Sequence, residues 1–240
     1  MDTKSKELKN SGDFHIWPFD FALSSSLEIP TQHIRPALPS NLFPTEIRPG
    51  ISLLSISVFD FTAESHSLTK PCTEVICGIH VMPNLGKARE LPKMSLYLLR
   101  MGATTKEFLE SPDAVDVQPF EKEPFQVNID KKNIAVECKD HQGRGIFSFH
   151  AEHKDPVYTQ DLFFIQTFCS KENTLYNGGV FMETNKFEHQ KKSRSIGKFH
   201  NHSFFQGIDI ESQDATDCYI QTWSKPGTQG VEFYEPFKPY

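Results

Sequence analysis

The stretch Ile51–Phe61 reads ISLLSISVFDF, and it indicates the fold more clearly than any other part of the chain. It is rich in β-branched and aromatic residues, it alternates in part between apolar and polar positions, and Pro49-Gly50 marks its start. Such a run is typical of a β-strand. Outward from it, similar runs recur at frequent, irregular intervals, and we expect further strands there. They cover residues 74–81, 94–101, 133–138, 145–151, 162–169, 207–210, 218–223 and 231–234.

Two stretches predict short helices. One covers residues 26–38, and the other covers residues 104–110, where Thr104 or Thr105 can cap the first turn. The polar stretch 171–200 predicts a long loop or an excursion from the sheet. The pattern as a whole predicts a mostly-β chain with a closed or sandwiched antiparallel sheet. We expect one domain over residues 14–240, preceded by a flexible, polar N-terminus over residues 1–13.

The composition limits the classes of partner. The chain has 240 residues, a net charge of -6 and a pI of about 5.9, which argues against nucleic acid as a partner. No run approaches the roughly 18 apolar residues of a membrane span, and the polar start predicts no secretory signal. The five cysteines form no Cys-x-x-Cys pair, so we expect reduced thiols and a cytoplasmic location. The sequence is compatible with a homo-oligomer as well as with a monomer.

The order of motifs resembles one known family. A predicted helix ends in Ala37-Leu38-Pro39-Ser40-Asn41-Leu42, a turn follows at Arg48-Pro49-Gly50, and a strand begins at Pro71-Cys72-Thr73-Glu74-Val75. Over about residues 30–110 this order resembles the acetoacetate decarboxylase-like superfamily, in which a Leu-Pro-x-x-Leu helix ending precedes a strand and a Tyr-x-Glu strand start. The resemblance implies an antiparallel β-barrel or cone around an apolar pocket, small oxo acid substrates, and no cofactor.

In the decarboxylases of this family a lysine forms an imine with the substrate, and a second, adjacent lysine lowers the pKa of the first. Both lie in a Gly-Arg-Glu…Pro-Lys-Lys pattern, because a lysine must be neutral to attack. One placement of the pattern makes Lys93 the reactive amine, with compressed spacings and with Met94 in place of the second lysine. Its residues are Gly86, Arg89, Glu90, Pro92 and Lys93.

A second placement follows the distance from Glu74. The family has its pattern well downstream of this glutamate, so Gly102 rather than Gly86 is the counterpart of the glycine. The lysine position then falls near Glu110, which is not an amine. Both placements stay open, and the second favours an inherited fold without the imine chemistry.

Other candidate residues lie on the predicted strands. Alternation places Glu74 and His80 on one face of their strand, where a buried carboxylate and an imidazole can act as general acid and base. Arg100 lies inside an apolar run, and Arg100 or Arg89 could bind a substrate carboxylate. We therefore predict Lys93, Glu74 and His80 as catalytic residues.

Two other classes of function compete with this prediction. His200 and His202 form a His-x-His pair on a predicted strand, which could bind a metal as in cupin-like enzymes. The second competing class is a small-molecule binding protein without catalytic activity. The favoured hypothesis is an enzyme, a lyase or isomerase of specialised metabolism, that acts on a small carbonyl- or carboxylate-bearing molecule and is not a genuine acetoacetate decarboxylase.

Overall fold

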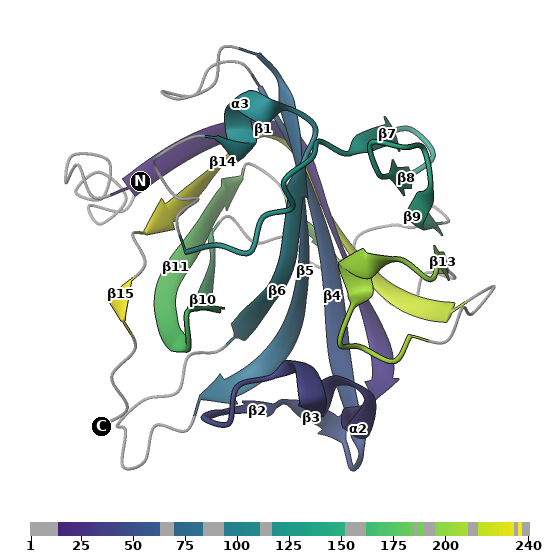
Figure 1. The fold of residues 1–240 in the computed structure, drawn as a ribbon. Helices are drawn as coiled ribbons and strands as arrows, with labels where there is room; N and C mark the ends of the chain where they lie inside the picture. The colour runs from purple at the N-terminus through teal and green to yellow at the C-terminus, as the bar shows by residue number, and fades with distance from the viewer. Residues whose placement is uncertain are drawn as a thin grey trace.

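Most of the described chain lies in β-strands, with only a few short helices (Figure 1). The computed structural model describes residues 14–62, 70–83, 94–110, 117–151, 162–184, 187–189, 195–210, 216–232 and 235–236. The mostly-β prediction is therefore confirmed. The predicted N-terminal segment 1–13 lies outside the described residues.

The long strands make one strongly curved sheet. Around it, the pairing order is β11-β10-β6-β5-β4-β1-β14, and β11 pairs with β14 as well as with β10. The strands therefore surround a central space. β10 pairs in parallel with β6, so the sheet is mixed and not purely antiparallel as predicted. The long strands are β1 (Phe14–Pro30), β4 (Ile51–Phe61), β5 (Cys72–Pro83), β6 (Ser95–Ala103), β10 (Leu162–Lys171), β11 (Thr174–Thr184) and β14 (Thr216–Glu232).

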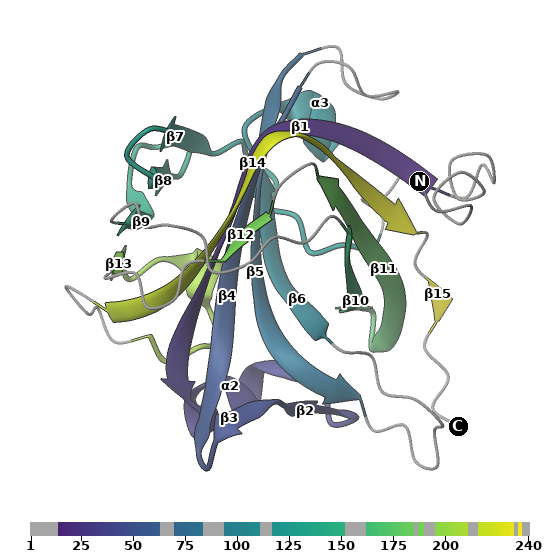
Figure 2. The same cartoon turned by 180° about the vertical axis from the view of Figure 1, so that it is seen from behind.

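Shorter strands and helices cover the outside and the ends of the sheet. Figures 1 and 2 show β7, β8, β9 and β13 on one side of the long strands, with β10 and β11 on the other. The short strands are β2 (Leu42–Pro44), β3 (Glu46–Arg48), β7 (Gln126–Asp130), β8 (Ala135–Lys139), β9 (Gly145–Ala151), β12 (Phe187–His189), β13 (Ser195–Phe199) and β15 (Glu235–Pro236). The helices are α2 (Thr31–Ile34), η1 (Arg35–Ala37), α3 (Lys106–Leu109) and η2 (Ser203–Phe205).

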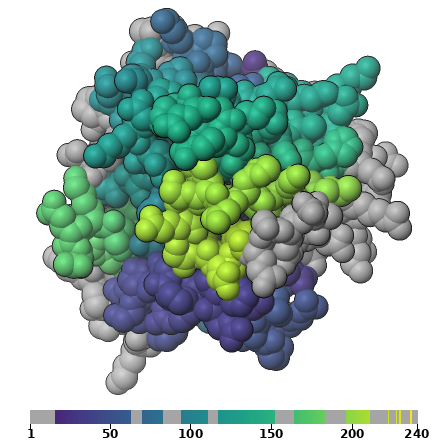
Figure 3. All heavy atoms as spheres, turned by 45° about the vertical axis from the view of Figure 1, so that its right-hand side comes forward, coloured from purple at the N-terminus to yellow at the C-terminus, as the bar shows by residue number. Residues whose placement is uncertain are grey.

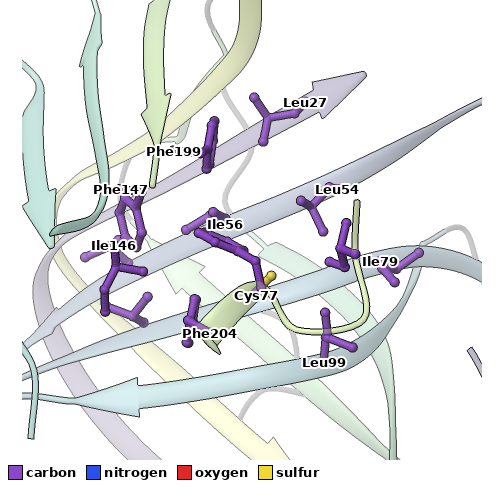
Figure 4. Close-up of a cluster of buried hydrophobic side chains, with 14 of the residues drawn as sticks. Leu27, Leu54, Ile56, Cys77, Ile79, Leu99, Ile146, Phe147, Phe199 and Phe204 are labelled. Atoms are coloured by element: carbon purple, nitrogen blue, oxygen red, sulfur yellow. The ribbon is translucent and has the colours of Figure 1, made fainter. Parts of the chain in front are cut away.

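The main core lies outside the cone, between β1, β4, β5 and β6 and the strands β8, β9 and β13. Along β4 every second side chain points outward, and Leu54, Ile56 and Val58 are buried there. In Figure 4 the outward side chains of β4 lie in one cluster with Phe147 of β9 and Phe204 of η2. Each buried side chain of this size stabilises the fold by about 1.5–3 kcal/mol relative to exposure. The inward residues of the same strands are thereby left to face the central space.

The segment 195–210 joins two parts of the molecule that are far apart in sequence. Figure 3 shows it between the part that holds β7–β9 and the part that holds α2 and β3. His200 N donates to Ile146 O at 3.0 Å, and Asp209 N donates to His33 O at 3.3 Å. The segment therefore closes the outer core from the side.

The predicted helix over 26–38 is wrong in its first part. Residues 26–30 belong to β1, because Ser26 pairs with both Ser55 of β4 and Tyr219 of β14. Ladder hydrogen bonds on both sides override a weak local helix preference. Only Thr31–Ile34 and Arg35–Ala37 are helical, and Pro36 prevents a longer helix.

The other local predictions had mixed outcomes. The helix near 104–110 is confirmed as α3, and Thr105 Oγ1 caps it by accepting from Phe108 N at 3.3 Å. The predicted loop over 171–200 is wrong for its described part, because β11, β12 and β13 lie there. The predicted strand over 207–210 is also wrong, since these residues form a turn after η2.

Candidate functional site

A cavity of about 530 Å³ lies inside the curved sheet. The inward-facing residues of β1, β4, β5, β6, β10, β11 and β14 line it. Most of its wall is apolar, as at Ile76, Leu98, Met101, Ile165 and Met182. A volume of 300–1,000 Å³ is typical of small-molecule sites. The cavity is therefore the candidate site, and its polar side chains decide its chemistry.

Glu74 and Gln229 form a buried polar pair in this wall. Glu74 points inward from β5 and Gln229 from β14, and they are 4% and 2% exposed. The Gln229 side chain hydrogen-bonds to the Glu74 carboxyl. Within the described structure, Glu74 Oε2 and Gln229 Oε1 have no hydrogen-bond partner. Two buried polar atoms without partners at a cavity wall are the atoms that a bound ligand would satisfy.

Burial changes the protonation of Glu74. Removal from water disfavours the charged carboxylate and raises the pKa of Glu74 to about 8, although the hydrogen bond from Gln229 acts in the opposite direction. At pH 7 the carboxyl is therefore neutral in most molecules. A neutral carboxylic acid can donate a hydrogen bond or a proton to a ligand oxygen.

A row of serine hydroxyls from β1 and β4 forms a second polar region. Ser57 Oγ donates to Ser24 Oγ at 2.9 Å, and the Oγ atoms of Ser26 and Ser55 are 2.8 Å apart. His80 Nε2 extends the row from β5, 2.6 Å from Ser55 Oγ. Burial lowers the pKa of His80 to about 4, so the imidazole is neutral at pH 7.

Sequence reasoning missed this serine row. Its signal is present in the sequence, as Ser55 and Ser57 alternate with apolar residues within ISLLSISV. Ser24 and Ser26 complete the row only because β1 continues as a strand to Pro30 and pairs with β4. The predicted helix over residues 26–38 hid this pairing.

An ion pair lies at another part of the cavity wall. Arg48 Nη2 donates to Glu28 Oε2, with Arg48 61% exposed and Glu28 28% exposed. Ile47 of β3 lines the cavity next to them and is 45% exposed. The exposure of these residues indicates that the cavity opens to solvent here. The carboxylate of Glu28 neutralises the guanidinium in this opening.

Comparison with solved structures identifies the fold. The enduracididine biosynthesis enzyme MppR in complex with pyruvate is 9% identical, with 95% of this chain and 91% of that chain covered and a TM-score of 0.62. Acetoacetate decarboxylase from Legionella pneumophila is 9% identical, with 95% and 88% covered and a TM-score of 0.64. An acetoacetate decarboxylase-like enzyme from Sphingomonas wittichii is 9% identical, with 95% and 94% covered and a TM-score of 0.55.

The fold resembles that of acetoacetate decarboxylase and acetoacetate decarboxylase-like enzymes. No protein-family model matches the chain, and no curated protein matches its sequence. The likeness to these enzymes is therefore visible in the three-dimensional arrangement and not in the sequence comparisons. The likeness covers nearly the whole chain, whereas the sequence resemblance was limited to about residues 30–110.

Two of the predicted catalytic residues line the cavity of this acetoacetate decarboxylase-like fold. Glu74 and His80 both face it from β5, in agreement with the predicted alternation. They are six residues apart on one strand, so their backbones are separated by about 20 Å at 3.3 Å per residue. The two side chains therefore serve different parts of the cavity and do not act as a directly bonded pair.

Arg100 lies outside the cavity. The pairing of β5 with β6 shifts register between Cys77 and Gly78, and Arg100 is opposite Cys77, which faces the outer core. Its Nη1 donates to Leu99 O at 3.0 Å, and its Nε is 3.8 Å from Glu121 Oε1. The prediction that Arg100 binds a substrate carboxylate in the pocket is thus corrected by this shift.

The residues of the imine hypothesis are only partly described. Lys93 and Arg89 lie outside the described residues, while the adjacent Met94 lines the cavity. Glu110, near the lysine position of the second placement, is exposed at the end of α3. The next described segment contributes Gln118 to the wall. Among the described residues of the wall there is no lysine.

The proposed histidine metal pair takes a different arrangement. His200 and His202 follow β13 and do not lie on a strand. His202 Nδ1 accepts from Phe204 N at 3.1 Å, and its Nε2 is 3.2 Å from Asp140 Oδ2. Both ring nitrogens are therefore occupied in capping η2 and bonding Asp140. No group of three or more metal-binding side chains occurs within the described ranges.

None of the helices in the described part of the chain is long and apolar enough to cross a bilayer.

Proposed function

We propose that this protein is an enzyme of the acetoacetate decarboxylase-like superfamily, a lyase or isomerase acting on an organic molecule with a carbonyl or carboxylate group. The observation that carries the proposal is the buried Glu74 carboxyl, whose Oε2 lacks a partner at the cavity wall within the described structure. The structural neighbours support it, because MppR and the decarboxylases are enzymes of the same fold.

The chemistry follows from the neutral state of Glu74. An apolar site that keeps a carboxylic acid protonated at pH 7 allows it to donate a hydrogen bond to a carbonyl oxygen. That bond strengthens as negative charge develops on the oxygen, which happens when a bond to the neighbouring carbon breaks and an enol or enolate forms. Gln229 holds the carboxyl in place by its hydrogen bond. Loss of carbon dioxide from a 3-oxo acid and removal of an α-proton in an isomerisation both form such an enolate.

Replacement of Glu74 by Gln tests this function. The variant keeps the size of the side chain but cannot transfer a proton, so we expect turnover to fall by about 10²–10⁴-fold. Wild type and variant would be compared by NMR on a panel of 2-oxo acids, 3-oxo acids, ketones and enoates, following carbon dioxide release and exchange of the α-hydrogen for deuterium.

The matched control is Glu137→Gln, which makes the same change at an exposed carboxylate on β8. Its turnover should equal that of the wild type. Equal turnover by Glu74→Gln would overturn the proposed role of Glu74. Binding of panel members without any turnover by the wild type would instead favour the binding protein considered above.

The imine hypothesis for Lys93 gives a separate prediction. Since Met94 replaces the second lysine of the family pattern, nothing in that pattern is left to lower the pKa of a lysine at position 93. We expect no adduct when the protein is treated with borohydride and 2- or 3-oxo acids and its intact mass is measured. An adduct that is absent in Lys93→Ala would contradict this expectation and establish the imine mechanism.

A further inference from the structure

The size of the cavity exceeds that of a small oxo acid. Liquid water occupies about 30 Å³ per molecule, so 530 Å³ corresponds to roughly 15–20 non-hydrogen atoms. Pyruvate, which is bound in the MppR structure, has six non-hydrogen atoms. A ligand of that size would leave most of the apolar wall in contact with water, and it would gain little from burial. The volume therefore favours a larger ligand.

The described wall carries no net charge that a small acid could pair with. The carboxyl of Glu74 and the imidazole of His80 are both neutral at pH 7, because burial disfavours their charged forms. The charge of Arg48 is already balanced by Glu28. A carboxylate placed in this wall would lose hydration without gaining an unpaired cation among the described residues, which is costly. Neutral polar groups on the ligand are favoured instead.

The polar groups of the wall lie in two regions. Glu74 and Gln229 form one region, and the serine row with His80 forms the other, in which Ser57 is opposite Ile76 and Ser55 is opposite Gly78. On β5 and β6 the wall between Glu74 and His80 is apolar, as at Ile76 and Leu98. Because Glu74 and His80 are six residues apart on one extended strand, a ligand that reaches both regions must be elongated.

We propose that the natural ligand is a neutral, elongated and mostly apolar carbonyl compound with a hydroxyl group at its far end. Its carbonyl lies against Glu74 and Gln229, its apolar part contacts Ile76 and Leu98, and its hydroxyl joins the hydrogen-bonded row at Ser55 and His80. This inference rests on the proposed function for the position of the carbonyl. It narrows the substrate class from small keto acids to long ketones.

A series of methyl ketones tests the inference by isothermal titration calorimetry with the full chain. The series comprises 2-butanone, 2-octanone and 2-dodecanone, with 12-hydroxydodecan-2-one and the matching ω-carboxylate as end-group probes. We expect Kd to fall by about fourfold per methylene until the cavity is filled, from 0.8 kcal/mol for each buried methylene. The hydroxylated ketone should bind at least tenfold more tightly than the carboxylate.

A variant locates the far end of the ligand. Ser55→Ala removes the hydroxyl at the centre of the row but leaves the apolar wall in place, so it should weaken the hydroxylated ketone by about tenfold. The binding of 2-dodecanone should not change. Ser148→Ala, a serine-to-alanine change on β9 outside the cavity, is the control for effects of substitution.

The outcomes separate this inference from the proposed function. Equal affinity for short and long ketones, tighter binding of the carboxylate, or no effect of Ser55→Ala would overturn the inference. The same titrations on Glu74→Gln do not depend on turnover, so the dependence on chain length should persist there even if Glu74 proves not to be catalytic. A failed turnover test with an intact chain-length series would therefore reject the proposed function alone.

Discussion

The wild-type protein is expected to lose stability as the pH rises from 6.5 to 8. In the Glu74→Gln variant this loss should be absent. The pKa of Glu74 is raised from 4.5 to about 8 in the folded protein, because the carboxyl is buried. The folded state therefore binds more protons than the unfolded state between these two values. Stability is full below pH 4.5 and is lost as the pH rises through about 8.

His80 acts in the opposite direction at lower pH. Burial lowers its pKa from 6.5 to about 4, so the folded state binds fewer protons than the unfolded state in that range. Its contribution is present above pH 6.5 and is lost as the pH falls toward 4. The two effects partly cancel between pH 4.5 and 6.5, and the effect of Glu74 remains above pH 6.5.

The measurement is urea-induced unfolding of wild type and Glu74→Gln at a series of pH values. From pH 6.5 to 8 the wild type should lose about 1.5 kcal/mol of unfolding free energy relative to the variant. Glu137→Gln, at an exposed position, should follow the wild-type curve. Parallel curves for wild type and Glu74→Gln would show that Glu74 is not buried as the structure describes.

Gly102→Ala is expected to destabilise the protein by about 1–3 kcal/mol or more. Gly102 lies on β6, and a Cβ at this position would be 2.2 Å from Cε2 of Phe125. The Phe125 ring is only 6% exposed and packs edge-on against Phe204, with ring centroids 5.4 Å apart. The ring cannot move aside without disturbing the outer core, so strain is unavoidable.

A second substitution tests whether the contact with Phe125 is the cause of the destabilisation. Phe125→Leu removes ring atoms from the position that the new methyl group would occupy. The double variant should therefore be more stable than the sum of the two single effects predicts, when all are measured by urea unfolding. Strict additivity, or a Gly102→Ala protein as stable as the wild type, would mean that close packing is not the reason for glycine at this position.

Gly102 also illustrates a packing requirement that the local sequence does not reveal. In the sequence it was matched to a glycine of the family pattern by its distance from Glu74. In the structure its lack of a side chain is required by the approach of Phe125 to β6. A ring that arrives from residue 125 leaves no sign in the local sequence around residue 102.

Local patterns predicted much of the strand content and part of the site. Ile51–Phe61 is a strand with the predicted bounds, and Gly145–Ala151 is another. Alternation along β5 correctly placed Glu74 and His80 on one face. These successes share one cause: the direction of a side chain on a strand depends on the position of its own residue, with period two.

The rest was decided by pairing between distant segments. The serine row needs β1 beside β4, Gln229 reaches Glu74 from the last long strand, and a register shift against β5 turns Arg100 outward. The sequence by itself determined which residues are strand-forming and which of them share a face. Only the tertiary structure decided which faces enclose the cavity, because register and curvature arise from contacts between residues far apart in the chain.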